Sequence, residues 1–372
     1  MKRIYLILAV LLVLAPITFF VAIDLIFPDF ASHQMQKDDS VIENAKALDL
    51  WLQDLQSAGN FNGGVLVIDG GQVLLKKTYG YKDWKQTEHL NASSAFRLAS
   101  LSKQFTAAAI MLLNDKDSLD YDDPVKRYLT AFPFEKVTIR HLLNNTSGLS
   151  TEYFELAEIH RTQVGDTLST LEAVNLVCQY STELQFESGS AYQYCNTNYV
   201  LLAAIVEDIS LGSFEAFMTQ DLFNPLGMRN SRVWNLMSKN NFPNKVEGFK
   251  RTSNQAIPVE PTFVDGVAGD DGIFSSLDDL VIWDQFWKDN ILISNQSLAE
   301  AFKTPILVNG NRSKYGFGWM VEQNGVHWHN GNWIGAKTYI ERDVSKGRVV
   351  VLLDNSSNPF FNQIREEIKE YF

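Results

Sequence analysis

Ser100 and Lys103 are two residues whose types and spacing suit nucleophilic catalysis. They stand in Ser100-Leu101-Ser102-Lys103, shortly before the apolar run Ala107 to Leu113, which predicts a helix. Side chains three positions apart on a helix share one face, so the amine is expected beside the hydroxyl. Free backbone N–H groups at a helix start also favour a developing oxyanion. An amine in a dry, apolar setting loses basicity, and we expect Lys103 to help take the proton of Ser100.

The pattern Ser-x-x-Lys is weak by itself, because both residue types are common. A serine that caps a helix, followed by a solvated lysine, is the competing explanation. Almost no other charge occurs between Ser100 and Leu113, however. A solvated lysine belongs on a polar helix face, and this helix scarcely has one. The context therefore favours a functional Lys103.

Tyr194 and Asn196 form a second candidate pair, directly before the Leu- and Ala-rich stretch Tyr199 to Ile209. Positions two apart in extended backbone face the same way, so both side chains can enter one cleft. A phenol beside an ammonium is a usable base, and an amide can bind both Lys103 and a substrate carbonyl. Taken alone, the tyrosine is more often a packing residue and the asparagine a helix cap.

His329 and Gly331 form the third candidate group, in a run that begins at Val326 and alternates like a strand. We expect His329 to point into the cleft, and Gly331 to leave room where a substrate approaches the strand edge. An edge strand can pair with a peptide-like substrate. A structural histidine and a turn glycine are again the competing explanation.

The elements that position these residues follow from the period of the apolar residues. Val41 to Ala58 repeats apolar residues at helical spacing, and a final helix is expected from Pro359 to Phe372. Five runs read as strands and bracket a mostly helical region; they are Gly64 to Asp69, Gln72 to Tyr79, Val326 to His329, Lys337 to Arg342 and Arg348 to Asp354. The fold class predicted is α+β, with one antiparallel sheet built from both chain ends and flanked by helices. Residues 41–95 and 310–372 would form the sheet lobe, and residues 96–309 an inserted, mainly helical lobe.

The amino terminus predicts a targeting segment. Lys2 and Arg3 precede the apolar run Ile4 to Ile23, which contains no charge. The run is about long enough to span a bilayer, so we expect residues 1–27 to be a membrane anchor, or else a cleaved signal peptide, followed by a linker over residues 28–40. Positive residues stay on the cytoplasmic side, which places the body of the protein outside the cytoplasm.

Composition narrows the partners and cofactors. The net charge is -12, and no basic cluster stands out, which excludes a nucleic-acid partner. Cys178 and Cys195 are the only cysteines, so one disulfide is the most that can form. The spacing of the Cys and His residues does not resemble a metal site, and no cofactor is expected.

Together the three groups resemble the serine β-lactamase and penicillin-binding protein superfamily, in particular class C β-lactamases, D-alanyl-D-alanine carboxypeptidases and related esterases. Ser-x-x-Lys is a motif of that superfamily. The resemblance extends from about Asn60 to Leu353. Four further stretches carry it, namely Leu142 to Leu149, Pro225 to Met228, Gly272 to Leu280 and Tyr315 to Trp319.

The resemblance implies a role for each group. Ser100 is the nucleophile, Lys103 and Tyr194 share the role of base, and Asn196 positions the amide of the acyl group. The backbone N–H groups of Ser100 and Asn332 form the oxyanion hole. His329 stands where many relatives carry lysine, which is closer to the peptidases and esterases. Three positions depart from the usual pattern without removing a catalytic group: Cys195 for Ser, Ser188 for Pro and Asn145 for His.

The predicted function is hydrolysis through an acyl-enzyme on Ser100. The substrate is a D-amino-acid peptide, a β-lactam or a carboxylic ester, ranked in that order. The alternative is a catalytically silent binding or scaffold protein with the same fold. A silent protein has no physical reason to keep all five side chains, which are those of Ser100, Lys103, Tyr194, Asn196 and His329. The sequence leaves the oligomeric state open.

Overall fold

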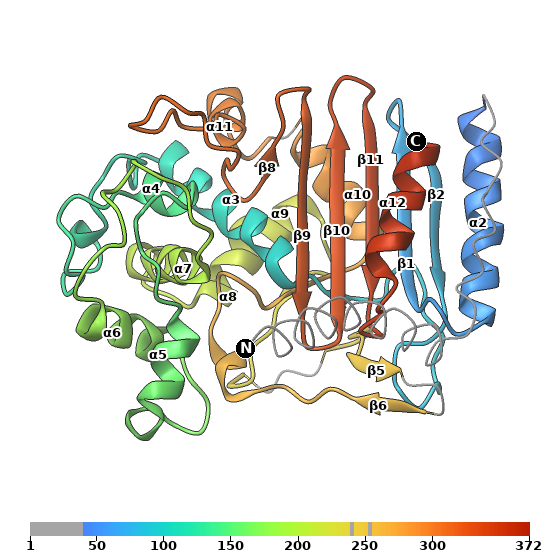
Figure 1. Ribbon diagram of the computed structural model, residues 1–372, viewed down its shortest axis with the longest axis horizontal. Helices are drawn as coiled ribbons and strands as arrows, with labels where there is room; N and C mark the ends of the chain where they lie inside the picture. Colours follow the sequence, from blue (N-terminus) through green and yellow to red (C-terminus); the bar gives the residue numbers. More distant parts are fainter. Residues whose placement is uncertain (1–39, 239–241, 252–254, 290) are drawn as a thin grey trace, which may run out of the picture.

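A central antiparallel sheet organises the protein, and it contains six strands in the order β2-β1-β11-β10-β9-β8 (Figure 1). The computed structural model describes residues 40–238, 242–251, 255–289 and 291–372. The expected anchor over residues 1–27 lies outside these residues, as does all of the linker except Ser40. In the stretch that is described, no helix has the length and apolar character needed to cross a bilayer.

The sheet combines strands from both parts of the chain. Its members are β1 (Gly63–Asp69), β2 (Gln72–Tyr79), β8 (Met320–Val321), β9 (Val326–Trp333), β10 (Ala336–Asp343) and β11 (Arg348–Asp354). β1 and β11 pair at the centre of the sheet, with Gly63 opposite Asp354 and Ile68 opposite Val349. The prediction of one antiparallel sheet built from both chain ends is therefore confirmed.

Both faces of the sheet are buried, because alternate residues of each strand point to opposite sides. Val65 and Val67 of β1 pack under α2 (Val41–Ser57) and α12 (Phe361–Tyr371), which lie on the same face. Leu66 and Ile68 belong to the main core on the other face. On that side α10 (Leu277–Phe286) places Leu277 directly against β1 at Gly64. Two helical layers therefore enclose the sheet.

The segment between the two halves of the sheet is mainly helical, and α4, α5, α6 and α7 lie to one side of β9, whereas α10 lies behind the sheet (Figure 1). Its helices are α3 (Ser102–Asp115), α4 (Ile139–Leu143), α5 (Tyr153–Ile159), α6 (Thr170–Tyr180), α7 (Asn196–Ser210), α8 (Phe214–Phe217), α9 (Asn224–Leu226) and α11 (Asn295–Ala301). Two small sheets interrupt it, with strands β3 (Phe96–Arg97), β4 (Arg232–Val233), β7 (Ile273–Ser275), β5 (Phe249–Arg251) and β6 (Ala256–Pro258).

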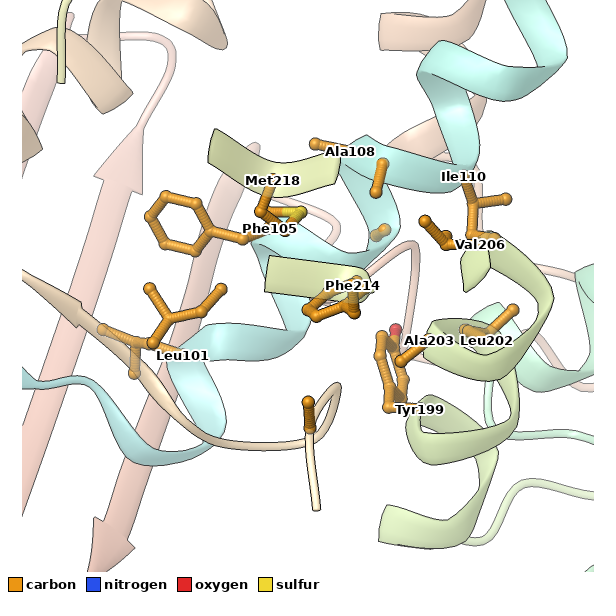
Figure 2. Close-up of a cluster of buried hydrophobic side chains, with 14 of the residues drawn as sticks. Leu101, Phe105, Ala108, Ile110, Tyr199, Leu202, Ala203, Val206, Phe214 and Met218 are labelled. Carbon is orange, nitrogen blue, oxygen red and sulfur yellow. The ribbon is translucent and has the colours of Figure 1, made fainter. Parts of the chain in front are cut away.

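Helix α3 is the centre of the main core. Its residues from Ser102 to Leu113 are all buried, as expected for a helix that is apolar on nearly every side. Figure 2 shows Phe105, Ala108 and Ile110 of α3 gathered with Tyr199, Leu202, Ala203 and Val206 of α7, and with Phe214 and Met218. This packing fixes α3 and α7 relative to each other. The amino-terminal ends of these two helices carry Ser100, Lys103 and Asn196.

Two glycines allow other parts of the chain to touch the start of α3. A Cβ atom added to Gly331 of β9 would lie 2.6 Å from the carbonyl oxygen of Leu98 and 2.9 Å from the Cβ of Ala99. Gly318, at φ +75°, passes equally close to the backbone of Lys103 and Gln104. We expected Gly331 to leave room for a substrate. Its immediate neighbours are instead Leu98, Ala99 and Thr338, so its small size lets β9 pack on the turn that carries Ser100.

We predict that Gly331→Ala lowers the free energy of unfolding by about 1 to 3 kcal/mol, the usual cost of overpacking a rigid site. It should also slow chemical labelling of Ser100, because the added methyl group pushes the Leu98–Ala99 backbone away from β9. Urea denaturation and single-turnover labelling measure the two effects. Gly212→Ala is the control, since no atom lies within 3.8 Å of an added methyl group there. Wild-type stability and labelling in Gly331→Ala would contradict the proposed contact.

Candidate active site

Ser100 lies in a tight turn between β3 and α3. The short 3₁₀ turn Ala99–Leu101 leads directly into α3, and Ala99 has φ 49°, which is uncommon for a residue other than glycine. Strand β7 holds the turn on both sides, because the Ile273 carbonyl accepts from Leu98 N at 2.8 Å and Ile273 N donates to Ser102 Oγ at 3.1 Å. The strained turn is thus fixed in place, and Ser100 lies at the start of α3, as expected.

Lys103 is fully buried and points back to Ser100. Its Nζ lies 3.2 Å from Ser100 Oγ, 2.7 Å from Asn196 Oδ1 and 2.9 Å from the carbonyl oxygen of Asp270. An ammonium group has three N–H donors and no acceptor, so three surrounding oxygens match its protonated form. The structure therefore brings Ser100, Lys103 and Asn196 together, from the starts of α3 and α7.

The electrostatic surroundings of Lys103 differ from those we expected. Burial lowers its pKa, but the effects of Tyr194, Asp270 and Glu152 outweigh burial, and the net result is a raised pKa. The expectation that a dry, apolar setting weakens this base is therefore wrong. The setting is dry but not apolar, because oxygens and carboxylates surround the amine.

Glu152, just before α5, holds Asn196 in its orientation. Its Oε1 accepts hydrogen bonds from Asn196 N at 3.1 Å and from Asn196 Nδ2 at 3.0 Å, and its Oε2 accepts one from Thr197 N at 3.2 Å. The carboxylate thereby satisfies free N–H groups at the start of α7. It also leaves Asn196 Oδ1 facing Lys103. One of the two N–H donors of the Asn196 side chain remains for a substrate carbonyl.

Tyr194 and His329 flank Lys103 on the side of the helical region. Lys103 Nζ lies 5.0 Å from the centre of the Tyr194 ring, and the nearby Tyr194 side chain helps raise the pKa of Lys103. The ring of Tyr194 lies 6.1 Å from that of His329 and 6.0 Å from that of Tyr315. Lys103, Tyr194 and His329, which come from separate parts of the sequence, thus form one cluster.

His329 is neutral and buried beside Tyr315. Its Nδ1 lies 2.7 Å from the Asn330 carbonyl, which can only accept, so Nδ1 carries the proton and Nε2 accepts from the Tyr315 hydroxyl at 2.9 Å. Burial, together with the charge of Lys103, lowers the pKa of His329 to about 3. We expected His329 to point into the cleft and polarise it. The structure places its uncharged ring against Tyr315, 6.1 Å from the ring of Tyr194, and its role in the cleft stays a prediction.

A cavity of about 70 Å³ opens beside Ser100. Ser100, Asn196, Asn332 and Trp333 line it, together with a set of charged side chains, which are Arg97, Asp265, Asp270 and Asp271. Strand β8 pairs only with His327 and Trp328, which leaves the Asn330–Trp333 edge of β9 without a partner strand among the described residues. The cavity therefore combines the Ser100 hydroxyl, a free strand edge and an excess of carboxyl groups.

Arg97 and Asp265 connect the two walls of this cavity. The Arg97 guanidinium donates to Asp265 at 2.5 Å and to Asp271 at 2.7 Å, and Asp265 also accepts from the Trp333 indole at 3.0 Å. Arg97 precedes the nucleophile turn, and Trp333 follows Asn332 at the end of β9. The Asp265 carboxylate therefore fixes the distance between Ser100 and the neighbourhood of Asn332.

Asp270 is a buried carboxyl group next to Lys103. The hydroxyl of Tyr153 donates to it at 3.4 Å, and its own carbonyl oxygen holds Lys103. Burial is the main reason that the pKa of Asp270 rises from 3.8 to about 7, although the charge of Lys103 opposes the rise. Asp270 is thus the cavity group whose charge changes most near neutral pH.

Glu152, Asp265 and Asp270 were not among the residues that we predicted. Glu152 closely follows the quoted stretch Leu142 to Leu149, and Asp270 stands just before the stretch that begins at Gly272. The position of these acidic residues beside recognised motifs is the signal in the sequence that could have identified them. The described part of the chain contains no group of three or more His, Cys, Asp and Glu residues arranged to hold a metal ion.

The two cysteines are both free, so the disulfide left open by the sequence is absent. Cys195 is buried between Tyr194 and Asn196, and its Sγ lies 3.9 Å from the Thr151 carbonyl. Burial raises the pKa of its thiol to about 12. Its side chain is not part of the cavity lining, in agreement with its expected place away from the cleft.

Comparison with known proteins shows which family and which relatives this chain is similar to. Residues 48–370 match the Beta-lactamase family. Penicillin-binding protein 4* of Bacillus subtilis (strain 168) is 34% identical over 327 residues, which cover 83% of this chain and 71% of that protein. A D-aminopeptidase of Gluconobacter oxydans is 29% identical over 69% of this chain, and the match spans about half of that enzyme, 48% of its length.

Among solved structures, a penicillin-binding protein homologue from Pyrococcus abyssi has a TM-score of 0.72 to this chain. It is 25% identical, and the alignment covers 86% of this chain and 75% of the other. The likeness extends over the sheet and the helical region, and it bears out the predicted fold class.

The raised pKa of Asp270 leads to a prediction about stability. The folded pKa of about 7 exceeds the unfolded value of 3.8, so the folded state favours the neutral acid, and stability is lost as pH rises from about 4 to 7. Asp270→Asn should therefore gain stability over wild type, and the gain should grow by on the order of 2 kcal/mol between pH 5 and pH 8. Urea denaturation at the two pH values measures this difference.

Asp208→Asn is the control for that measurement, because Asp208 is exposed on α7 and the same substitution there removes a carboxylate that water solvates. A constant difference between Asp270→Asn and wild type across the pH range would show that Asp270 is already ionised in the folded protein at pH 5.

Proposed function

The chain belongs to the Beta-lactamase family, and on that premise we propose that it is a serine hydrolase that forms an acyl-enzyme on Ser100. The observation that carries the proposal is the contact of the buried Lys103 ammonium with both Ser100 Oγ and Asn196 Oδ1. Burying a charged amine in the core costs free energy of desolvation. A role in activating Ser100 would explain why Lys103 is nevertheless buried beside Ser100 and Asn196.

In the proposed first step, Ser100 Oγ attacks the carbonyl carbon of the substrate while its proton passes to the Tyr194–Lys103 pair. The surroundings of Lys103 favour its protonated form, so Tyr194 is the base of this pair in its phenolate form, and it becomes a neutral phenol when it takes the proton of Ser100. The positive charge of Lys103 stabilises the negative charge on Tyr194 before the transfer and on Ser100 Oγ during it. The bond to the leaving group breaks, and the leaving group takes up the proton from the same pair.

The developing oxyanion is assigned to the backbone N–H groups of Ser100 and Asn332. Both residues line the same cavity, and the Arg97–Asp265–Trp333 connection fixes their relative position. The remaining N–H of Asn196 is assigned to the acyl side of the substrate. In the second step, water attacks the ester carbon and gives one proton to Tyr194. The bond between that carbon and Ser100 Oγ then breaks, and Tyr194 passes the proton to Ser100.

The charge of the cavity bears on which of the three substrate classes is preferred. Three carboxyl groups and one guanidinium line it, and Asp265 and Asp271 already pair with Arg97. A substrate with an ammonium group near the scissile bond suits this balance better than one with a carboxylate. D-aminopeptidases are among the matched relatives, which supports the same choice. We therefore place amides and peptides of D-amino acids with a free amino group ahead of β-lactams and esters.

Loss of either member of the proposed base pair should slow acylation. We predict that Lys103→Ala and Tyr194→Phe each reduce the rate of acylation by a factor of about a hundred or more, the usual effect of losing a positioned general base. The double variant should lose little beyond either single change, because groups that act as a unit are not additive. Single-turnover labelling with an activated ester, followed by intact mass, measures the rates.

Tyr192→Phe is a matched control for Tyr194→Phe, because Tyr192 also packs on Tyr315 but makes no contact with Lys103 among the described residues. Cys195→Ser should leave acylation nearly unchanged. His329→Ala should cost less in acylation than Lys103→Ala. The reverse order would make His329 the base, and failure of Ser100 to label at all would favour the silent binding protein.

The charge argument predicts an order among matched substrates. D-alanine p-nitroanilide, which is cationic, should be cleaved with kcat/KM roughly tenfold above its neutral N-acetyl form, and the anionic N-succinyl form should be slower again, as expected from charges a few ångströms apart near a protein surface. Asp270→Asn should reduce the differences in kcat/KM among these three substrates. Faster cleavage of the N-succinyl form by wild type would contradict the proposed preference.

A further inference from the structure

A second cavity, of about 280 Å³, lies on the other side of the β9–β10 turn from Ser100. Trp333 lines the Ser100 cavity, whereas Ile334 and Ala336 line the second one, and Arg97 contributes to both. The other walls come from widely separated segments, which include the loop after β2, the residues after β4 and the region around β6. The proposed acylation uses none of the residues that belong to this cavity alone.

The inner wall of this second cavity is aromatic. Trp234 and Phe274 are nearly fully buried, and their ring centres lie 6.0 Å apart in an edge-to-face arrangement. Trp84 adds a third, half-buried aromatic side chain. Aromatic walls of this kind favour a flat or apolar ligand body. The volume is close to the lower limit of about 300 Å³ that is typical of ligand pockets, which suits a ligand with a single ring or a short acyl chain.

Lys245 provides the charge in this cavity. Its Nζ lies 3.9 Å from the centre of the Trp234 ring and 5.6 Å from that of Phe274, and its side chain is half-buried. Burial, followed by the nearby charge of Arg97, lowers the pKa of Lys245. The neighbouring cation Arg97 is neutralised by Asp265 and Asp271. Lys245 has no such partner, because no carboxylate of residues 40–238, 242–251, 255–289 or 291–372 lies within ion-pair distance of its Nζ.

The acidic residues that line this cavity do not form an ion pair with Lys245. Glu247 and Glu260 are exposed at its rim, where water solvates them. Asp354 is buried, and its Oδ1 accepts hydrogen bonds from Ser356 N at 2.8 Å and from Asn358 N at 3.2 Å. A ring face stabilises a cation, but it does not replace oxygen acceptors for the three N–H donors of an ammonium. An anionic group placed beside Lys245 would supply them.

We propose that this cavity is a second binding site, for a small ligand that carries a carboxylate on a flat apolar body. The carboxylate binds Lys245, and the apolar body lies along Trp234, Phe274 and Trp84. The ligand arrives either as a free molecule or as the distal end of an acyl group attached to Ser100, and the chemistry of recognition is the same for both. The site does not depend on the proposed hydrolase activity.

The test uses ¹⁹F NMR titration of the purified protein with 4-fluorobenzoate and with its neutral analogue 4-fluorobenzamide. The benzoate should bind at least roughly tenfold more tightly, because a hydrogen bond to a charged group is stronger than one between neutral groups. Lys245→Met should remove this difference, and Lys245→Arg should retain it. Lys250→Met is the matched control, since Lys250 is exposed on the neighbouring strand β5.

Two further arms separate the sources of the ligand and the location of the probe. Reaction of Ser100 with a compact fluorophosphonate should leave benzoate binding intact. A long fluorophosphonate that ends in a carboxylate should compete with benzoate in wild type, but not in Lys245→Met, if the cavity receives the distal end of an acyl group. The proposal is overturned if benzoate and benzamide bind equally, if the preference survives in Lys245→Met, or if the compact reagent abolishes binding.

Discussion

The structure around the active site depends on one constraint, which is that the charge of Lys103 must be balanced inside the core. A buried ammonium group is tolerated only where oxygens replace the water it has lost. Ser100, Asn196 and the carbonyl of Asp270 supply these oxygens from three separate segments. The start of α3, the start of α7 and the loop before β7 must therefore meet at one point. The packing of α3 against α7 and the small size of Gly318 are what permit that meeting.

The same constraint extends to a second layer of acidic residues. Glu152 orients Asn196, and Asp265 holds Arg97 and Trp333, so neither needs to contact a substrate to influence the site. Asp270 differs from these two residues, because it lies beside Lys103 and also lines the cavity, where a substrate could contact it. An excess of carboxylates near Ser100 thus follows in part from the need to keep one lysine charged.

Much of the architecture could be predicted from the sequence, because local patterns determine it. The hairpin at Gly70 and Gly71, the period-two strands near the end and the apolar helix after Ser100 all follow from residue type and spacing, and the structure contains them within a few residues. Ser100 and Lys103 also meet as their spacing implied, whereas the contact of Lys103 with Asn196 joins residues that no local pattern connects. The position of β9 next to Ser100 required the family resemblance, since no local pattern connects residues this far apart.

The expectations that failed depend on tertiary surroundings. His329 keeps its expected alternation on β9, but its hydrogen bond with Tyr315 could not be foreseen, because Tyr315 comes from a loop whose path the sequence does not give. The basicity of Lys103 was misjudged because its neighbours Asp270 and Glu152 lie far away in the sequence. Gly331 was assigned to substrate access because the approach of Leu98 and Ala99 to β9 leaves no local pattern.

The pairing of β1 with β11 has a consequence for how the protein folds. Gly63 lies opposite Asp354, so the sheet cannot close until the chain has been synthesised as far as Asp354. Contacts between such distant residues carry a large loop-closure entropy and form slowly. Until β9 has paired into the sheet, the turn that bears Ser100 lacks the strand that packs against it. The nucleophile is therefore assembled only at the end of folding, and a nascent or partly folded chain carries Ser100 without the surroundings that would make it reactive.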